Sequence, residues 1–299
     1  MPNTFDLNEL KNTNRLPSPS GTALEIMRLL QTDNVLISDI AGLVKMDPAL
    51  SARIIKFVNS AGTSNQRNIM NVNDAIVMVG MTAVKNFALS LSLITKDSQH
   101  RCNGFSYISF WSLSLARAVA LMALNHFERI IPPEEGFTFG LLADIGRLAV
   151  ASVWNEEYSD CLFSTHNEMD LKKMESTLFS INHDEMSLLL LKDWGFSGLF
   201  VDSLAASFTT NSARSNRLAT QLILARQLAI YCVETDSERR NLLSDLDANF
   251  KQYNLKGFEL LPFLDNLLIQ WKEWGNLIDI KTNVPYSKLF FLKNSVSES

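Results

Sequence analysis

Three residues of this sequence have side chains whose type and spacing could support chemistry: Asp144, Arg147 and His183. Asp144 and Arg147 lie in the segment GLLADIGRLAVAS, and His183 lies near the start of NHDEMSLLLLKDWGF. A carboxylate and an imidazole can bind a divalent metal ion, and a guanidinium can bind phosphate. One carboxylate and one imidazole are too few to fix a metal ion and activate its bound water. We therefore predict no catalytic residue, no metal ligand set and no cofactor.

Helices must position these residues, because helical spacing of apolar residues dominates the chain and no segment shows convincing strand alternation. The segment after Asp47-Pro48 has the cap and first-turn proline of a helix start, and Gly195 is typical of a helix end. The spacing predicts one apolar helix over residues 137–154. Further helix caps are predicted at Ser38, Asn73 and Asn182.

The fold class predicted is all-α: a two-lobed helical bundle in which N-terminal helical hairpins pack on a second helical lobe. Residues 95–106 are polar and rich in turn formers, which indicates a connector between the lobes. The predicted divisions are a flexible segment 1–15, a domain 16–210 with lobes 16–95 and 105–210, and a C-terminal helical extension 211–299 packed on the same body.

The composition is that of a globular protein, with 46% hydrophobic and 20% charged residues and a net charge of -5. An acidic total argues against a nucleic-acid partner. Cys102, Cys161 and Cys232 are far apart and form no CxxC pair, so we expect reduced, buried thiols. The N-terminus lacks a signal-peptide pattern, and we expect no apolar run of about 20 residues that could span a membrane, so we predict a cytoplasmic protein with no membrane contact.

An ordered set of motifs over residues 16–210 resembles the HDOD family, a non-catalytic relative of the HD and HD-GYP metal-dependent phosphohydrolases. The resemblance implies an HD-like core in the second lobe. The matching segments are LPSPSGTALEIMRLL, DPALSARIIKFVNSA, NDAIVMVGMTAVKNFALS, FWSLSLARAVALMA, FTFGLLADIGRLAV and NHDEMSLLLLKDWGF.

The sequence departs from the hydrolase pattern at the positions of the metal ligands. By the resemblance, the first histidine falls near Leu113, the histidine of the His-Asp pair falls at Ala143, and a later histidine pair falls near residues 204–208. Only Asp144 and His183 remain of that set. The resemblance therefore implies a vestigial pocket around Asp144, Arg147 and His183.

The resemblance, together with the missing metal ligands, implies a non-enzymatic bacterial signal-transduction module that acts by protein–protein contact or by sensing a small nucleotide. The expected partners are signalling proteins in trans: receiver, kinase or cyclic-di-GMP-related proteins. A nucleotide ligand would occupy the vestigial pocket, with Arg147 contacting its phosphate or instead forming a surface salt bridge.

Two other functions stay open. The first is a residual metal-dependent phosphohydrolase that uses Asp144 and His183. The second is a DNA-binding regulator that uses residues 36–60, where Arg53 and Lys56 could face DNA, although the apolar residues of that helix demand burial.

Trp271 and Trp274 lie three residues apart on one predicted helix near the C-terminus. Core packing is the ordinary role of such a pair. An exposed Trp-Leu stripe would instead mark a partner-binding face, so both tryptophans are interaction candidates.

Overall fold

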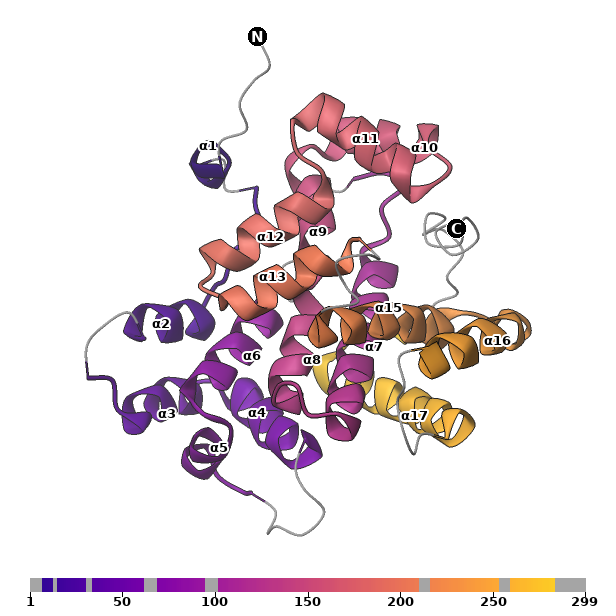
Figure 1. Cartoon of the computed structure of the whole chain (residues 1–299). Helices are drawn as coiled ribbons and strands as arrows, with labels where there is room; N and C mark the ends of the chain where they lie inside the picture. The colour runs from indigo at the N-terminus through magenta and orange to yellow at the C-terminus, as the bar shows by residue number, and fades with distance from the viewer. Residues whose placement is uncertain are drawn as a thin grey trace.

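The structure is a computed structural model that describes residues 7–12, 15–30, 34–61, 69–94, 102–209, 216–252 and 259–282. Every regular element in these ranges is a helix, and none is a strand. The prediction of an all-α, two-lobed bundle is confirmed. Figure 1 shows α2 to α6 on one side and α15 to α17 on the other, with α7 and α8 between them.

The N-terminal lobe is built from short helices joined by tight breaks. Asp47 accepts a hydrogen bond from the Leu50 N–H at 2.9 Å, and Pro48 opens the helix that follows, as predicted. Within the predicted flexible segment, residues 7–12 form a helix. The helices are α1 (Leu7–Asn12), α2 (Thr22–Leu29), α3 (Ile37–Lys45), α4 (Pro48–Ala61), α5 (Val72–Val79) and α6 (Met81–Ile94).

The second lobe is centred on α7, which packs along α8, and on α9, which packs against α12. Close packing of α7 and α8 requires Gly140, where a Cβ would lie 2.7 Å from the Ala118 Cα. The helices are α7 (Tyr107–Phe127), α8 (Pro133–Leu142), α9 (Ile145–Val153), α10 (Asn155–Ser164), α11 (Glu168–Phe179), α12 (His183–Asp193) and α13 (Gly198–Ser207).

The single helix predicted over residues 137–154 is wrong, because α8 ends at Leu142 and α9 begins at Ile145. In a continuous helix the Gly140 carbonyl would accept the Asp144 N–H. Here the Gly140 carbonyl accepts a hydrogen bond of 2.8 Å from Arg117 Nε of α7. The break leaves Asp144 at φ -107° and ψ 23°, at the junction of two helices, where its carboxylate faces the core.

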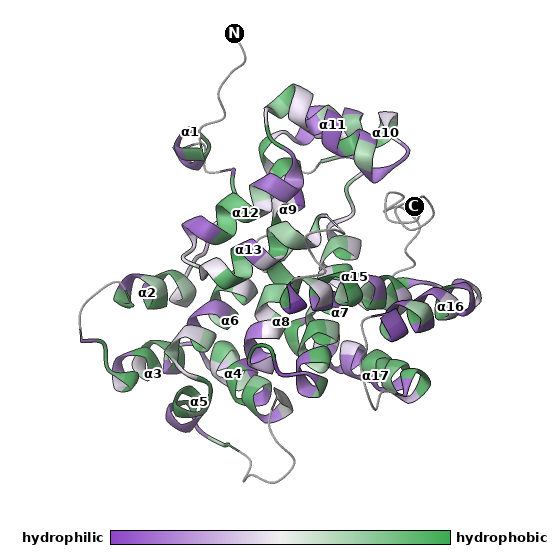
Figure 2. Cartoon of the chain, in the orientation of Figure 1, coloured by the Kyte–Doolittle hydropathy of each residue, from purple (hydrophilic) through white to green (hydrophobic). Residues whose placement is uncertain are grey.

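Three C-terminal helices complete the body: α15 (Arg217–Val233), α16 (Asp236–Gln252) and α17 (Leu260–Ile278). Helix α15 packs on α7 and α13, and α17 packs on α7. Figure 2 shows α16, which lies outermost, as largely hydrophilic.

The interaction role considered for Trp271 and Trp274 is wrong, because the side chains are 2% and 4% exposed. Trp271 Nε1 donates a hydrogen bond of 3.1 Å to the Ser112 carbonyl of α7. The Trp274 ring lies 4.5 Å from the Phe137 ring and 5.9 Å from the Phe57 ring. These contacts join α17 to both lobes, so the face of α17 that carries the two tryptophans belongs to the core.

The expectation that no apolar run reaches membrane-spanning length is also wrong. Residues Tyr107–Phe127 and Pro133–Val153 are long and apolar enough to span a membrane, and the pair α5–α6, bent by 110°, passes the same test as one broken span. Within the structure, the most apolar part of Tyr107–Phe127 is 78% buried and that of Pro133–Val153 is 100% buried. Packing at the centre of the bundle accounts for their composition.

Candidate functional site

Asp144 is held by two arginines from different parts of the chain. Its Oδ2 forms an ion pair with Arg117 Nη1 of α7, and its Oδ1 lies 3.3 Å from Arg226 Nη2 of α15. Arg117 is 2% exposed and Asp144 is 8% exposed. The two cations therefore occupy both oxygens of the carboxylate that a metal ion would use.

The arginines keep this buried carboxylate ionised. Burial alone would raise the pKa of Asp144, but the positive charges of Arg117, Arg226 and Arg147 outweigh burial and hold the pKa far below its usual range. The charge of Asp144 is thus compensated entirely from within the protein.

Arg147 lies one turn after Asp144 and forms an ion pair with Glu168 at the start of α11. The salt bridge matches one of the two roles expected for Arg147, but its location differs from the expectation, since Arg147 is buried rather than at the surface. Burial alone would lower the pKa of Arg147, but nearby negative charges, Glu168 above all, outweigh burial and raise it.

His183 is the first residue of α12 and is clamped by two carboxylates. Its Nδ1 lies 2.6 Å from Glu175 Oε2, its Nε2 lies 2.8 Å from Glu168 Oε1, and its backbone N–H donates to Glu175 at 2.9 Å. Burial and Arg147 lower the pKa of His183, but Glu175 and Glu168 outweigh them and raise it to about 9. His183 is therefore an imidazolium at neutral pH, and an imidazolium has no lone pair to offer a metal.

We call Asp144, Arg147, His183 and their ion-pair partners the charge cluster. Close contact between α9 and α12 fixes how far His183 lies from Asp144 and Arg147. Ser187 Oγ donates to the His183 carbonyl at 3.0 Å and accepts from the Gly146 N–H at 2.9 Å. A Cβ on Gly146 would overlap the His183 carbonyl oxygen and lie 2.5 Å from the Ser187 nitrogen. Helices α9 and α12 can approach this closely only because residue 146 is a glycine.

One side of the cluster is partly open to solvent. Lys172 pairs with Asp184, and its Nζ lies 5.7 Å from the centre of the Phe208 ring. The Arg226 guanidinium lies 6.0 Å from the same ring, and the Lys172 and Arg226 side chains are 28% and 31% exposed. Phe208 thus sits beside two cations at the rim.

The cluster also contains buried polar atoms without a partner. Among the described residues, Arg117 Nη2, Glu168 Oε2 and Tyr158 Oη have no hydrogen-bond partner. Burial raises the pKa of Tyr158 well above its usual value, so its hydroxyl stays protonated.

The donor set does not fit a divalent metal ion. In the part of the chain that the structure describes, no three His, Cys, Asp or Glu side chains are arranged to hold one. Leu113 and Ala143, which stand where the resemblance expects histidines, are buried apolar residues. The remaining histidines do not contribute, since His126 and His166 are exposed and His100 lies outside the described residues.

One face of the helix proposed to read DNA belongs to the core. Ile54, Phe57 and Val58 of α4 are each 0% exposed, as their apolar character predicts. Lys56 is exposed and Arg53 is half-buried. The apolar face of α4 therefore packs against the lobe, which leaves its opposite face, with Lys56, open to solvent.

Sequence reasoning identified Asp144, Arg147 and His183 but missed their partners. Glu168 and Glu175 lie on α11, and Arg117 and Arg226 lie on α7 and α15. Arg117 carried the one available signal, since it is the lone charged residue within an apolar stretch of 20 residues from Ser106 to Asn125. Such a residue needs a buried counter-charge.

Three comparisons place the chain among known proteins. The response regulator MmoQ of Methylococcus capsulatus str. Bath is 38% identical, with a TM-score of 0.51, over 85% of this chain and 94% of that one. A Shewanella amazonensis SB2B protein, whose name assigns it to the phosphohydrolases, is 22% identical, with a TM-score of 0.62, over 92% and 97%. An uncharacterized Treponema pallidum (strain Nichols) protein is 23% identical over 186 residues, which are 60% of this chain and 35% of that protein.

The chain thus spans about a third of the length of the Treponema relative. The family model of the HDOD domain matches residues 16–209, which is more than half of the 299 residues. The chain belongs to the HDOD family.

Proposed function

We propose that this protein is a non-enzymatic module of bacterial signal transduction that works by contact with other signalling proteins. One observation carries the proposal: Arg117 and Arg226 neutralise Asp144, so that the carboxylate of the HD-like core is committed to an internal ion pair. Without a carboxylate and neutral imidazoles to bind a metal ion, the cluster cannot activate water. The likeness to the response regulator MmoQ agrees with a signalling role.

The N-terminal lobe offers a surface for such contact. Met46, Met70 and Val77 are 77%, 85% and 66% exposed. Met46 follows α3, Met70 precedes α5 and Val77 lies on α5, and these two helices meet where Lys45 Nζ donates to Asn73 Oδ1 at 2.5 Å. We name these three residues the methionine patch. Exposed methionines adapt to varied partner surfaces, which suits a protein that relays signals.

The partners we propose are receiver, kinase or cyclic-di-GMP-related proteins, met in trans in the cytoplasm. Capture from cells of the source organism tests this with matched baits: the wild type, the variant Met46→Gln/Val77→Gln, and Met169→Gln, which changes a methionine of α11 that is 66% exposed. We expect the wild type and the Met169→Gln control to retain the same signalling protein. The patch variant should lose it at least about tenfold.

The hydrolase alternative is tested by metal content and turnover. We expect Asp144→Ala and the wild type to carry equally little transition metal, and neither to hydrolyse phosphoesters with added Mg²⁺ or Mn²⁺. A stoichiometric metal ion that is present in the wild type and lost in Asp144→Ala would contradict the proposal.

Sensing of a small nucleotide has separate support in the charge of the cluster. Arg117, Arg147, Arg226 and protonated His183 carry four positive charges, against three negative charges on Asp144, Glu168 and Glu175, while Lys172 and Asp184 balance each other. The excess charge and the rim at Phe208 favour an anion with an aromatic base. Calorimetry with mononucleotides and cyclic dinucleotides tests it: Arg226→Gln should weaken binding, and heats equal to dilution would exclude it.

A further inference from the structure

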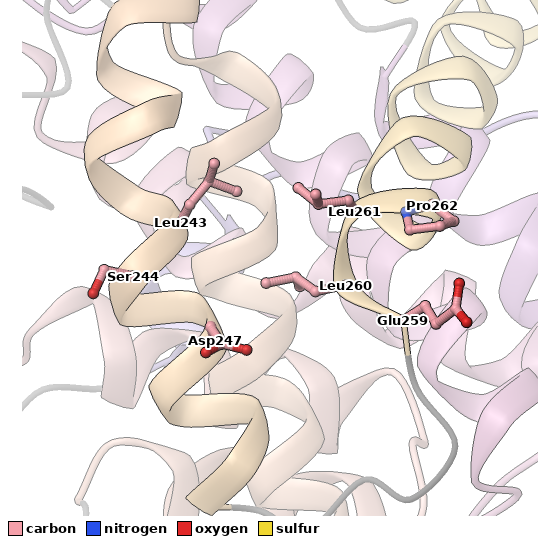
Figure 3. A pocket seen from close by; sticks show the side chains of 7 residues that line it. All are labelled: Leu243, Ser244, Asp247, Glu259, Leu260, Leu261 and Pro262. Atoms are coloured by element: carbon pink, nitrogen blue, oxygen red, sulfur yellow. The ribbon is translucent and has the colours of Figure 1, made fainter.

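The described residues contain a groove between α16 and α17 at the edge of the protein, and none of its lining residues belongs to the charge cluster. It has a volume of about 540 Å³ and is lined by Leu243, Ser244, Asp247, Glu259, Leu260, Leu261 and Pro262. Figure 3 shows Leu243 on one helix facing Leu260 and Leu261 on the other. Leu261 is 61% exposed, so the groove presents apolar surface with carboxylates beside it.

The end of α17 turns residues 280–282 back along the helix. Asp279 adopts φ 59° and ψ 41°, and the Ile280 N–H donates to the Gly275 carbonyl at 2.9 Å, which reverses the chain. A Cβ on Gly275 would overlap Thr282 Cγ2 and lie 2.7 Å from the Ile280 carbonyl oxygen. Residues 280–282 therefore run back along α17 and have already returned to the level of Gly275.

The helix surface ahead of Thr282 leads to the groove. Gly275, Leu268 and Leu261 are seven residues apart, so they lie on nearly the same side of α17. Leu261 lies about 21 Å from Gly275 along the helix axis. An extended chain covers that distance in about seven residues, so Leu289 is within reach of the groove.

The residues within reach of the groove have chemistry that matches it. Residues 283–299 lie outside the described residues, and their sequence contains Lys288-Leu-Phe-Phe-Leu-Lys293, an apolar run with a lysine at each end. The groove supplies apolar side chains and the carboxylates of Asp247 and Glu259. Asp247 also pairs with Lys251 at 2.5 Å, but this pair is exposed and weak, so Asp247 can accept a second cation.

We propose that residues 288–293 of the same chain dock in the groove between α16 and α17, with the apolar run against Leu243, Leu260 and Leu261. Lys288 and Lys293 then lie near Glu259 and Asp247. This intramolecular contact is independent of the signalling role proposed above, since it involves neither the charge cluster nor the methionine patch.

Zero-length carbodiimide cross-linking of the full chain tests the docking. An equal mixture of unlabelled and ¹⁵N-labelled protein separates links within a chain from links between chains. We expect Lys288 or Lys293 to be joined to Asp247 or Glu259 within one chain, and the Lys251–Asp247 link reports that the reagent reaches the groove. Links mainly between chains, links to other carboxylates, or no link from either lysine would overturn the proposal.

Substitutions that leave the fold intact make the test specific. Leu261→Asp, at a 61% exposed position, should lower the yield of the link about tenfold, whereas the control Leu199→Asp, at a 53% exposed position on α13, should leave it unchanged. Glu259→Lys should remove the Glu259 link, and adding Lys288→Glu should restore a link between positions 259 and 288. An unchanged yield in Leu261→Asp would show that the segment does not use the groove.

Discussion

Arg226 Nη2 lies 3.3 Å from Asp144 Oδ1, although the two residues are 82 positions apart and Arg226 comes from a helix outside the matched domain. The second contact of the same carboxylate, with Arg117, is more deeply buried. Loss of the Arg117 contact and loss of the Arg226 contact should therefore lower the free energy of unfolding by different amounts.

Asp144→Ala should lower the free energy of unfolding by about 3–5 kcal/mol, because it leaves the buried Arg117 guanidinium without its counter-charge. Arg226→Ala should cost only about 1 kcal/mol, since the Arg226 side chain is 31% exposed and solvent can replace its partner. Urea unfolding followed by circular dichroism measures both. Equal losses in the two variants would contradict this ordering.

Because of His183, the free energy of unfolding should fall as pH rises from 6.5 through 9. Its pKa rises from 6.5 to about 9 on folding, so the folded state holds a proton that the unfolded state releases between these values. This contribution, about 3 kcal/mol, is complete below pH 6.5 and is lost as pH rises through 9. The difference in unfolding free energy between wild type and His183→Gln should therefore shrink from pH 6 to pH 9.5. A constant difference across that range would contradict the imidazolium assignment.

Gly146→Ala should destabilise the protein severely, by about 3 kcal/mol or more, because the new methyl group would overlap the His183 carbonyl. Gly42→Ala is the matched control. Gly42 lies inside α3 with nothing within 4 Å of the added Cβ, so that substitution should stabilise by about 0.5–1 kcal/mol. Thermal melting of both variants measures the contrast, and similar melting temperatures would refute the close approach of α9 and α12.

The three cysteines should be inert in the folded protein. All are buried and unpaired, and burial raises the pKa of Cys102 and Cys161 to about 11 and that of Cys232 to about 12. Ellman's reagent at pH 8 should therefore react with no thiol before unfolding and with all three in urea. Rapid reaction of one thiol in the native protein would place that cysteine at the surface.

Local sequence patterns predicted helix existence well and helix starts less well. Asn182 caps α12 as expected, but Asn71 rather than Asn73 caps α5. Ser38 lies inside α3, whose first turn is fixed by Asp39 accepting from the Leu36 N–H at 3.0 Å. In both misses the helix begins two residues earlier than the expected cap implies, and a neighbouring Asn or Asp side chain makes the hydrogen bond at its start.

The charge cluster was less predictable because its members meet only after folding. Asp144 and His183 could be found from motifs, but nothing local to either residue points to Arg226 or Glu175. The break at residue 143 is likewise imposed from α7, since Arg117 takes the Gly140 carbonyl. Tertiary contacts of this kind override the periodicity that predicted one long helix.

The contacts of α15 and α17 have a consequence for where this protein can be cut. A fragment ending at residue 209 would carry every motif by which the family is recognised. In that fragment the surface of α7 that α15 covers would be exposed to solvent. The Ser112 carbonyl would also lose the hydrogen bond that it accepts from the Trp271 indole. The segment that the family model matches is therefore shorter than the segment needed for folding. We expect a fragment that ends at residue 209 to aggregate.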